Sequence, residues 1–242
     1  MKRLENRVAI ITGGAAGIGA ATAIKFVQEG AKVVIWDLDE TKGNALAAKI
    51  DATFAKVNTA DYAQVEAGAK AVHDQFGRID ILINNAGITR DSTLKKMTIE
   101  QWQQVIDVNL TGVFYCSKIV SEYMLTNGWG RIVNASSVVG LYGNFGQTNY
   151  VATKSALIGM TKTMARELGR KGVTVNAVAP GFIATEMVAA MPENVIEGMK
   201  AKIPLARLGD PMEIANVYAF LSSDDASYIN GHTLSVDGGM TV

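Results

Sequence analysis

The stretch "RVAIITGGAAGIGAATAIKFV", residues 7–27, decides the fold class of this chain. It opens with a short apolar run at 7–12 that is typical of a buried strand, and a helical pattern begins at residue 17. A glycine-rich turn joins the two. Such a turn lets a pyrophosphate approach the backbone, and the helix N-terminus offers free N–H groups and a favourable dipole. The residues expected to bind a dinucleotide here are Thr12, Gly13, Gly17, Ile18 and Gly19.

Similar short apolar runs recur along the chain and alternate with helical patterns. The predicted strands are 7–12, 31–37, 52–58, 79–85, 130–136, 173–180 and 232–239. The predicted helices are 17–29, about 41–50, 61–76, 98–125, 149–170 and 211–221. Strict alternation of this kind favours a doubly wound parallel α/β sheet with helices on both faces. No repeat or linker interrupts residues 1–242, so we expect a single domain.

The composition argues against several classes of protein. The 23 basic and 23 acidic side chains give a formal net charge of +0 without a basic run, so nucleic-acid binding gets no support. The lone cysteine, Cys116, excludes an intramolecular disulfide framework and suits a reducing compartment. No segment has the length of a signal peptide or a membrane span, and no His, Cys and carboxylate cluster suggests a metal site. We therefore expect a cytoplasmic protein without a membrane partner or a metal.

Asp37 ends the second predicted strand, eighteen positions after Gly19. A carboxylate at this place can accept hydrogen bonds from the adenosine ribose hydroxyls. It would also repel a 2′-phosphate, and no arginine is at hand in the loop. We therefore predict that NAD is the cofactor, with NADH preferred over NADPH, although a solvated strand terminus is the alternative. Asn58, at the end of the next strand, is placed to meet the adenine edge.

The motif INNAG at 83–87 follows another predicted strand. Asn85 and Gly87 suit a strand end where the cofactor lies against the backbone. Asn and Gly also end strands for purely structural reasons, so this motif alone leaves both interpretations open.

A tyrosine and a lysine four residues apart, Tyr150 and Lys154, lie on one face of a predicted helix. A phenol has a reference pKa of about 10, and a neighbouring ammonium lowers it toward the range useful for proton transfer. The same lysine can reach the nicotinamide ribose. Ser137 ends the preceding strand and could hydrogen-bond a substrate carbonyl or alcohol. Asn109 lies in a helical stretch, where it either bonds nearby backbone or marks a kink that holds a water.

Together these motifs resemble the short-chain dehydrogenase/reductase family, and the resemblance covers essentially all 242 residues. The family implies a Rossmann-type fold. It implies Tyr150 as acid/base, Lys154 lowering the pKa of that phenol, Ser137 polarising the carbonyl and Asn109 supporting a water chain to Lys154. Ile183 and Thr185, in the "PGFIATEM" loop at 180–187, would contact the carboxamide end of the nicotinamide.

Within this family the chain is most similar to the 3-oxoacyl-(acyl-carrier-protein) reductases of fatty-acid metabolism. The phrases that carry this similarity are "NNAGITRD" at 84–91, the segment 136–159, "VNAVAPGFIATEM" at 175–187 and "VDGGM" at 236–240. An NAD-dependent dehydrogenase of another secondary alcohol, such as a 3-hydroxyacyl-CoA, a diol or a sugar, stays open. So does a cofactor-sensing binding protein, although that class would be expected to lose the catalytic hydroxyls.

Two departures bear on the substrate. Reductases of fatty-acid elongation usually take NADPH, whereas Asp37 points to NAD. They also dock an acyl carrier protein through basic residues, and at two such positions this chain has Gly128 and Lys171.

Three further expectations concern loops and assembly. The methionine-containing segment 184–204 is interpreted as an adaptable lid over an apolar substrate. Arg90 and Asp91 are expected to make structural or subunit contacts. By resemblance we expect a homotetramer built through the helices at 98–125 and 149–170 and the C-terminal strand.

Overall fold

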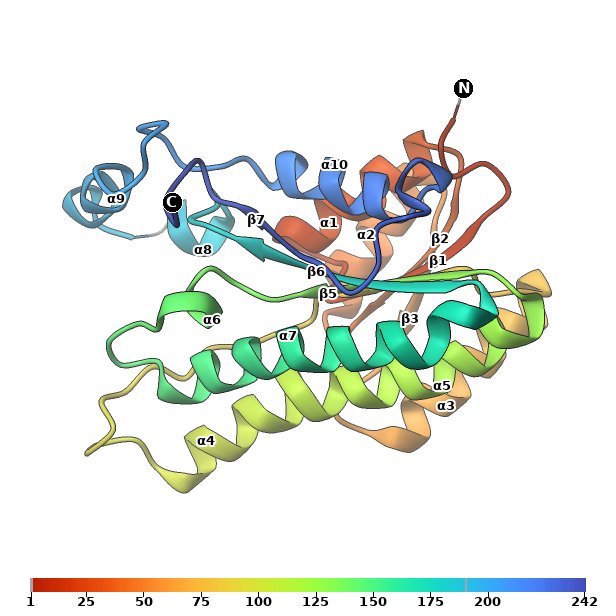
Figure 1. Cartoon of the computed structure of the whole chain (residues 1–242), viewed down its shortest axis with the longest axis horizontal. Helices are drawn as coiled ribbons and strands as arrows, with labels where there is room; N and C mark the ends of the chain where they lie inside the picture. Colours follow the sequence, from red (N-terminus) through yellow and green to blue (C-terminus); the bar gives the residue numbers. More distant parts are fainter. Residues whose placement is uncertain (1, 190) are drawn as a thin grey trace.

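A parallel sheet of seven strands runs through residues 2–189 and 191–242, the part of the chain that the computed structural model describes (Figure 1). The strand order is β3-β2-β1-β4-β5-β6-β7, and every neighbouring pair is parallel. The strands are β1 Val8–Thr12, β2 Lys32–Asp37, β3 Thr53–Lys56, β4 Ile81–Asn84, β5 Gly130–Ala135, β6 Val173–Pro180 and β7 Thr233–Val236. The predicted doubly wound sheet of the Rossmann type is confirmed, and its order reverses between β1 and β4.

Helices cover both faces of the sheet, α1, α2 and α10 on one and α3, α5 and α7 on the other (Figure 1). The helices up to α5 are α1 Gly17–Gln28, α2 Glu40–Ile50, α3 Tyr62–Phe76, α4 Ile99–Ile106 and α5 Gly112–Asn127, and the later α7 and α10 span Thr148–Leu168 and Pro211–Leu221. The remaining helices are α6 Val139–Tyr142, α8 Glu186–Ala189 and α9 Glu193–Lys200. Among the residues described, no helix combines the length and apolarity needed to cross a membrane.

The helix predicted over 98–125 is not continuous. A π-helical segment, Asp107–Thr111, separates α4 from α5 and contains Asn109. The Asn109 side chain is turned to the backbone of the loop after β4, and single π-turns of this kind often occur at functional sites. The helix is thus locally widened at Asn109, and the water-holding kink considered for this residue stays a prediction.

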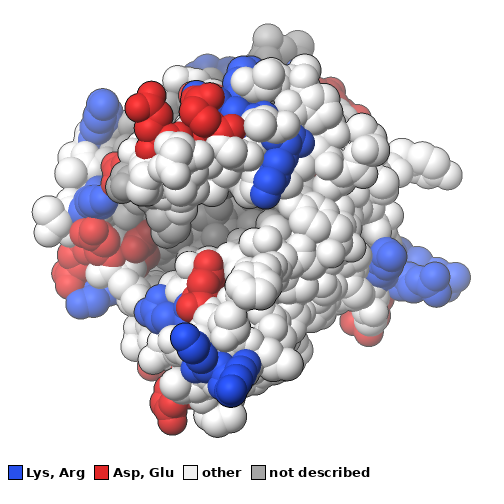
Figure 2. All heavy atoms as spheres, turned by 90° about the vertical axis from the view of Figure 1, so that its left-hand side faces the viewer, with Lys and Arg blue, Asp and Glu red and all other residues white. Residues whose placement is uncertain are grey.

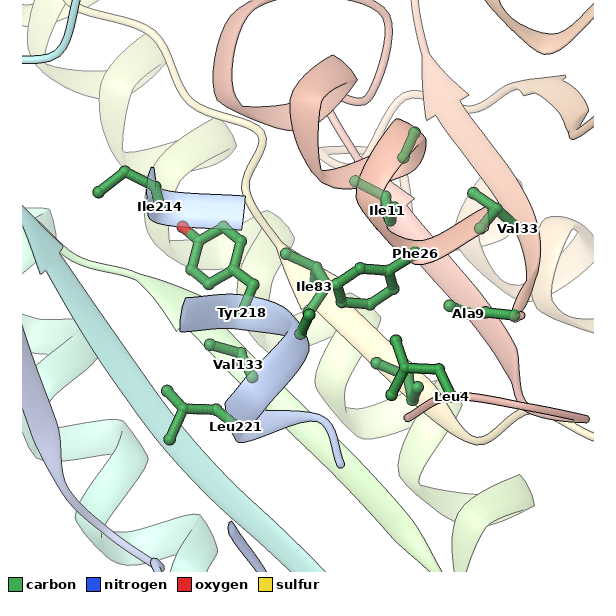
Figure 3. Packing of buried hydrophobic residues seen from close by; sticks show 14 of the residues in the cluster. Leu4, Ala9, Ile11, Phe26, Val33, Ile83, Val133, Ile214, Tyr218 and Leu221 are labelled. Carbon is green, nitrogen blue, oxygen red and sulfur yellow. The ribbon is translucent and has the colours of Figure 1, made fainter. Parts of the chain in front are cut away.

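The central strands β1 and β4 are buried on both faces, which explains their nearly continuous apolar sequences. Ile11 of β1 packs in the cluster beneath α1, α2 and α10, whereas its neighbour Ile10 packs in the cluster beneath α3, α5 and α7. Figure 3 shows Phe26 of α1 pointing into the first cluster, beside Ile83 of β4. This packing fixes α1, and with it the glycine turn, against the centre of the sheet.

Replacement of Phe26 by alanine should therefore lower the free energy of unfolding by about 3–5 kcal/mol, because the ring is fully buried at the centre of this cluster. Chemical denaturation followed by circular dichroism measures this difference. Phe145→Ala is the matched control, since that ring is 88% exposed. Its expected effect is within about 0.5 kcal/mol, and a similar loss in both variants would contradict the assignment of the core.

Candidate active site

A cavity of about 450 Å³ opens at the carboxyl ends of β1, β2 and β4, beside the point where the strand order reverses. In a doubly wound sheet this is the crevice where nucleotides bind. Of the residues predicted to bind a cofactor, those that line it are Gly13, Gly17, Asp37, Asn58, Asn85, Gly87 and Thr185. Wall residues that the sequence analysis did not single out include Trp36, Leu38, Ile88, Val108 and Glu186.

The glycine turn is held in place from behind by Thr12 and Asn85. The Thr12 hydroxyl accepts hydrogen bonds from the backbone N–H groups of Asn85 and Ala86, at 3.0 Å each. The Asn85 amide donates to the carbonyls of Thr12 and Gly13, at 3.1 Å each. A Cβ on Gly19 would lie 2.0 Å from the Gly13 carbonyl oxygen, so this position tolerates glycine alone. Thr12 and Gly19 thus shape the turn.

The turn fits the pyrophosphate of a dinucleotide. Gly13 and Gly17 have φ angles of +62° and +53°, a left-handed conformation that glycine adopts without strain. Helix α1 begins after Ala16, and within the described chain no side chain caps it. Its first N–H groups, at the cavity wall, can therefore bind an anion.

The Asp37 carboxylate is fixed at the end of β2. Its oxygens accept hydrogen bonds from the backbone N–H groups of Ala15 at 3.0 Å, Leu38 at 2.7 Å and Asp39 at 3.0 Å. These contacts hold the carboxylate at the cavity wall and leave it lone pairs for further donors. The geometry therefore suits the acceptor role predicted for Asp37.

A basic side chain that the sequence analysis missed stands close to Asp37. The Lys42 ammonium, on α2, forms an ion pair of 2.9 Å with Glu186 of α8. This pairing, with smaller contributions from Asp39 and Asp37, raises the pKa of Lys42. Glu186 lies 144 positions further along the chain, so no local sequence pattern could reveal the pair. This ion pair connects the segment after β6 to the helix after β2, and its Glu186 lines the cavity.

Lys154 is deeply buried beside Tyr150 on α7. Its ammonium donates a hydrogen bond of 2.6 Å to the Ala135 carbonyl and lies 5.4 Å from the centre of the Tyr150 ring. The Lys154 carbonyl accepts from the Ser136 hydroxyl at 2.8 Å. These contacts lock α7 to the end of β5, the strand that leads to Ser137. The three predicted residues Ser137, Tyr150 and Lys154 are thereby brought together.

Burial controls the protonation of this group. It raises the pKa of the Tyr150 phenol, and the nearby Asp91 carboxylate raises it further, while the Ser137 hydroxyl acts in the opposite sense. The lowered pKa predicted for this phenol is therefore wrong for the structure described, because desolvation dominates. Burial also lowers the pKa of the Lys154 ammonium from 10.5 to about 8.

Asn109 is wholly buried and clamps the loop after β4. Its amide donates to the Ile88 carbonyl at 2.9 Å, and its carbonyl accepts from the Ile88 N–H at 2.8 Å. A Cβ on Gly87 would lie 3.5 Å from the Asn109 oxygen and 3.6 Å from the Lys154 nitrogen. Both polar groups thus converge on Gly87, where the absence of a side chain leaves them room. The water chain proposed for Asn109 stays a prediction.

The loop after β6 closes the site from the other side. Ile183 is buried and forms an isolated bridge with Gly209, while the Thr185 methyl group lies 3.4 Å from a Cβ placed on Gly17. The predicted lid at 184–204 contains α8 and α9, helices that the sequence analysis did not assign. Residue 190 and the side chain of Met187 lie outside the described residues. Figure 2 views the face that carries α6, α8 and α9, which is hollowed at its centre.

Comparison with known proteins agrees with this geometry. Residues 13–241 match a family model described as enoyl-(acyl carrier protein) reductase. The chain is 47% identical over 245 residues to 3-oxoacyl-(acyl-carrier-protein) reductase FabG of Thermotoga maritima, with 99% of this chain and 100% of the relative covered. It is 49% identical over 250 residues to 3-oxoacyl-(acyl-carrier-protein) reductase of Synechocystis sp., with both chains covered fully. For the Escherichia coli FabG the identity is 44% over 238 residues, with 98% of each chain covered.

Burial of Lys154 should make stability depend on pH in a definite direction. Because the folded state binds the lysine proton more weakly than the unfolded state, stability is lost as pH falls through the folded pKa of about 8. Between about pH 7 and about pH 10 the free energy of unfolding should rise by roughly 2–3 kcal/mol relative to Lys154→Met.

Urea denaturation of both proteins across this pH range measures the difference. The Met variant cancels the titrations that the two chains share. A difference that is flat with pH would show that Lys154 titrates in the folded protein as it does in water.

Proposed function

Because the chain belongs to the short-chain dehydrogenase/reductase family, we propose that it interconverts a 3-oxoacyl thioester and its 3-hydroxy form with NAD(H). Membership of this family makes the protein an oxidoreductase that acts on CH–OH groups. The observation that carries the proposal is the convergence of Ser137, Tyr150 and Lys154 beside a cavity suited to a dinucleotide. A bound nicotinamide supplies or accepts the hydride, and the protein supplies orientation, hydrogen bonds and the proton.

Each side chain has a distinct task in the proposed reaction. Ser137 donates a hydrogen bond to the substrate carbonyl and so polarises it. Tyr150 gives its phenol proton to the oxygen as the alcohol forms, and takes a proton back in the reverse direction. Lys154 orients the nicotinamide ribose and keeps positive charge near the phenol. The raised pKa of Tyr150 keeps the phenol protonated near neutral pH, which is the form required for reduction.

The preference for NADH rests on Asp37 and on the state of Lys42. Asp37 offers a fixed carboxylate to the ribose hydroxyls and opposes a 2′-phosphate. Lys42 is the nearby cation that could offset this repulsion, but its charge is engaged by Glu186. The carboxylates of Asp37, Asp39 and Glu186 therefore leave a surplus of negative charge around the adenosine end. Asp37 equally favours NAD-dependent oxidation of another secondary alcohol, which is the second candidate.

A carrier-linked acyl group is the substrate class that the relatives' names favour, since they act on 3-oxoacyl groups of an acyl carrier protein. Gly128 and Lys171 precede β5 and β6, at the sheet edge opposite Tyr150 in the same protomer. Lys95 and Lys96, which follow the loop after β4, are exposed. Their charges could bind an acidic carrier.

We also propose the homotetramer expected from the family. A hollow between α5 and α7 is lined by Phe114, Met160, Met164 and Leu168, and the Phe114 ring is 49% exposed. Apolar groups on the outer side of two long helices are suited to contact between subunits. The cytoplasmic location stays a prediction.

Tyr150→Phe should reduce the turnover of an activated 3-oxoacyl thioester by about 10²-fold or more, because general acid catalysis contributes this much. NADH oxidation followed by absorbance measures turnover, and fluorescence titration measures cofactor binding. The dissociation constant for NADH should stay within about twofold, since the phenyl ring is kept. Full activity in the variant would remove Tyr150 from the mechanism.

Asp37→Ala should reduce the ratio of kcat/KM with NADH to kcat/KM with NADPH by about 10- to 100-fold, through loss of a charge-assisted hydrogen bond and of repulsion. Steady-state kinetics with both cofactors gives the ratio. Asp39→Asn is the matched control, because it removes an equal charge nearby and keeps the cap that Asp39 provides to α2. A wild-type enzyme that prefers NADPH would overturn the assignment outright.

A further inference from the structure

The residue before the proposed proton donor, Asn149, is fully buried and makes three hydrogen bonds. Its amide nitrogen donates to the carbonyl oxygens of Arg90, at 3.0 Å, and Gln101, at 3.2 Å. Its amide oxygen accepts from the Tyr150 backbone N–H at 2.8 Å. One side chain thus joins the loop after β4, helix α4 and the first turn of α7.

Asn149 replaces a conventional helix cap. Within the described chain, α7 begins without a side-chain hydrogen bond from Gln147, the residue at the N-cap. The Gln147 side chain is used elsewhere: its nitrogen donates to Asp91 at 2.9 Å and its oxygen accepts from Asn144 at 2.9 Å. The first N–H groups of a helix need partners, and Asn149 serves the one on Tyr150 itself.

The loop around Asp91 is bound to the same helix start by backbone contacts. Ser92 donates to the Gly146 carbonyl at 2.8 Å and pairs with Gln147 in an isolated parallel bridge. Two residues before Arg90, Ile88 is clamped by Asn109. Segment 88–92 therefore supports Asn109 on one side and the start of α7 on the other.

We propose that Asn149 and Asp91 are positioning residues for Tyr150, acting through the buried amide and through Gln147 to hold the phenol opposite Ser137. This rests on the proposed function, in which Tyr150 is the acid. The "ITRD" motif, expected to be structural or to form subunit contacts, then has a task inside the protomer. Neither residue touches the reacting atoms.

The charged and titratable groups around the phenol are few. Lys154 lies on the same helix, Ser137 follows β5, and Asp91 comes from the loop after β4. The buried Tyr218 phenol of α10 interacts with Tyr150. Asp91 is the acidic member of this group, and its charge disfavours the phenolate. Removal of that charge should therefore make Tyr150 a stronger acid.

The role of Asn149 in holding Tyr150 in position is tested by Asn149→Ala. We expect kcat to fall by about 10- to 100-fold, because small displacements of a catalytic group have effects of this size. The dissociation constant for NADH, measured by fluorescence titration, should stay within about twofold, since Asn149 does not line the cofactor cavity. Asn127→Ala is the matched control: it removes an exposed amide at the end of α5, away from the start of α7, and should leave kcat unchanged.

The effect of the Asp91 charge on Tyr150 is tested by Asp91→Asn, which keeps an oxygen acceptor for Gln147 and removes the charge. Reduction requires protonated Tyr150, so kcat/KM falls as pH rises through its pKa. The basic limb of the pH profile should move to lower pH in this variant, with the plateau kept. A purely structural role for Asp91 predicts no movement. Asp91→Ala, which also loses the Gln147 contact, should lower the plateau as well.

These outcomes separate the inference from the proposed function. Tyr150→Phe is measured in parallel: if it is inactive while Asn149→Ala and Asp91→Asn behave as wild type, the positioning proposal is overturned and the proton donor stands. If Tyr150→Phe retains full activity, the proposed mechanism fails first. Should Asn149→Ala fail to fold, the two Asp91 variants alone decide, since a wild-type plateau in Asp91→Ala and an unmoved limb in Asp91→Asn overturn the proposal.

Discussion

The site depends on the hydrogen bonds that join the Thr12 hydroxyl to the start of the loop that follows β4. This residue is almost fully buried, accepts from Asn85 and Ala86 and donates to the Ile83 carbonyl at 3.2 Å. It joins β1 to β4 at the point where the strand order reverses. A doubly wound sheet leaves a crevice there, and the hydrogen bonds of Thr12 set how the glycine turn and the loop after β4 face each other across it. From this loop, Ile88 reaches Asn109 and Arg90 reaches Asn149, so the cofactor end and the chemical end share one support.

Lys154 shows that such a support has an energetic cost. An ammonium is poorly solvated in the protein interior, and the carbonyl of Ala135 is its one hydrogen-bond partner within the described chain. Burial accordingly lowers the pKa of Lys154. The same burial places a cation next to Tyr150, the residue proposed to move a proton. Titratable groups with shifted pKa values are common at functional sites, where the packing of the rest of the fold offsets the cost of burying them.

Much of this arrangement could be predicted from the sequence because it is local. Strand β1, the turn to Gly19 and the spacing of Tyr150 and Lys154 follow from short-range periodicity. The break at Asp107–Thr111 could not be predicted, since it depends on a contact between Asn109 and Ile88, 21 positions apart. The pKa of Tyr150 was predicted in the wrong direction because the sequence gives the neighbouring charge but not the depth of burial. The role of Asn149 could not be predicted from the sequence for a related reason: its partners Arg90 and Gln101 are distant in the chain.

At the adenosine end of the cavity, the local charge comes from residues at β2, α2 and α8. Asp37 alone favours NAD, yet the field that a 2′-phosphate would meet is the sum of Asp37, Asp39, Lys42 and Glu186. Lys42 and Glu186 are largely exposed, so water and salt weaken their attraction. Asp37, in contrast, is fixed by three backbone N–H groups and cannot turn away. In the proposed preference for NADH, the fixed charge of Asp37 would set the sign, and the exposed pair of Lys42 and Glu186 would change its size. Because Glu186 begins α8, after β6, the charge at this end of the cavity depends on two segments that are far apart in the sequence.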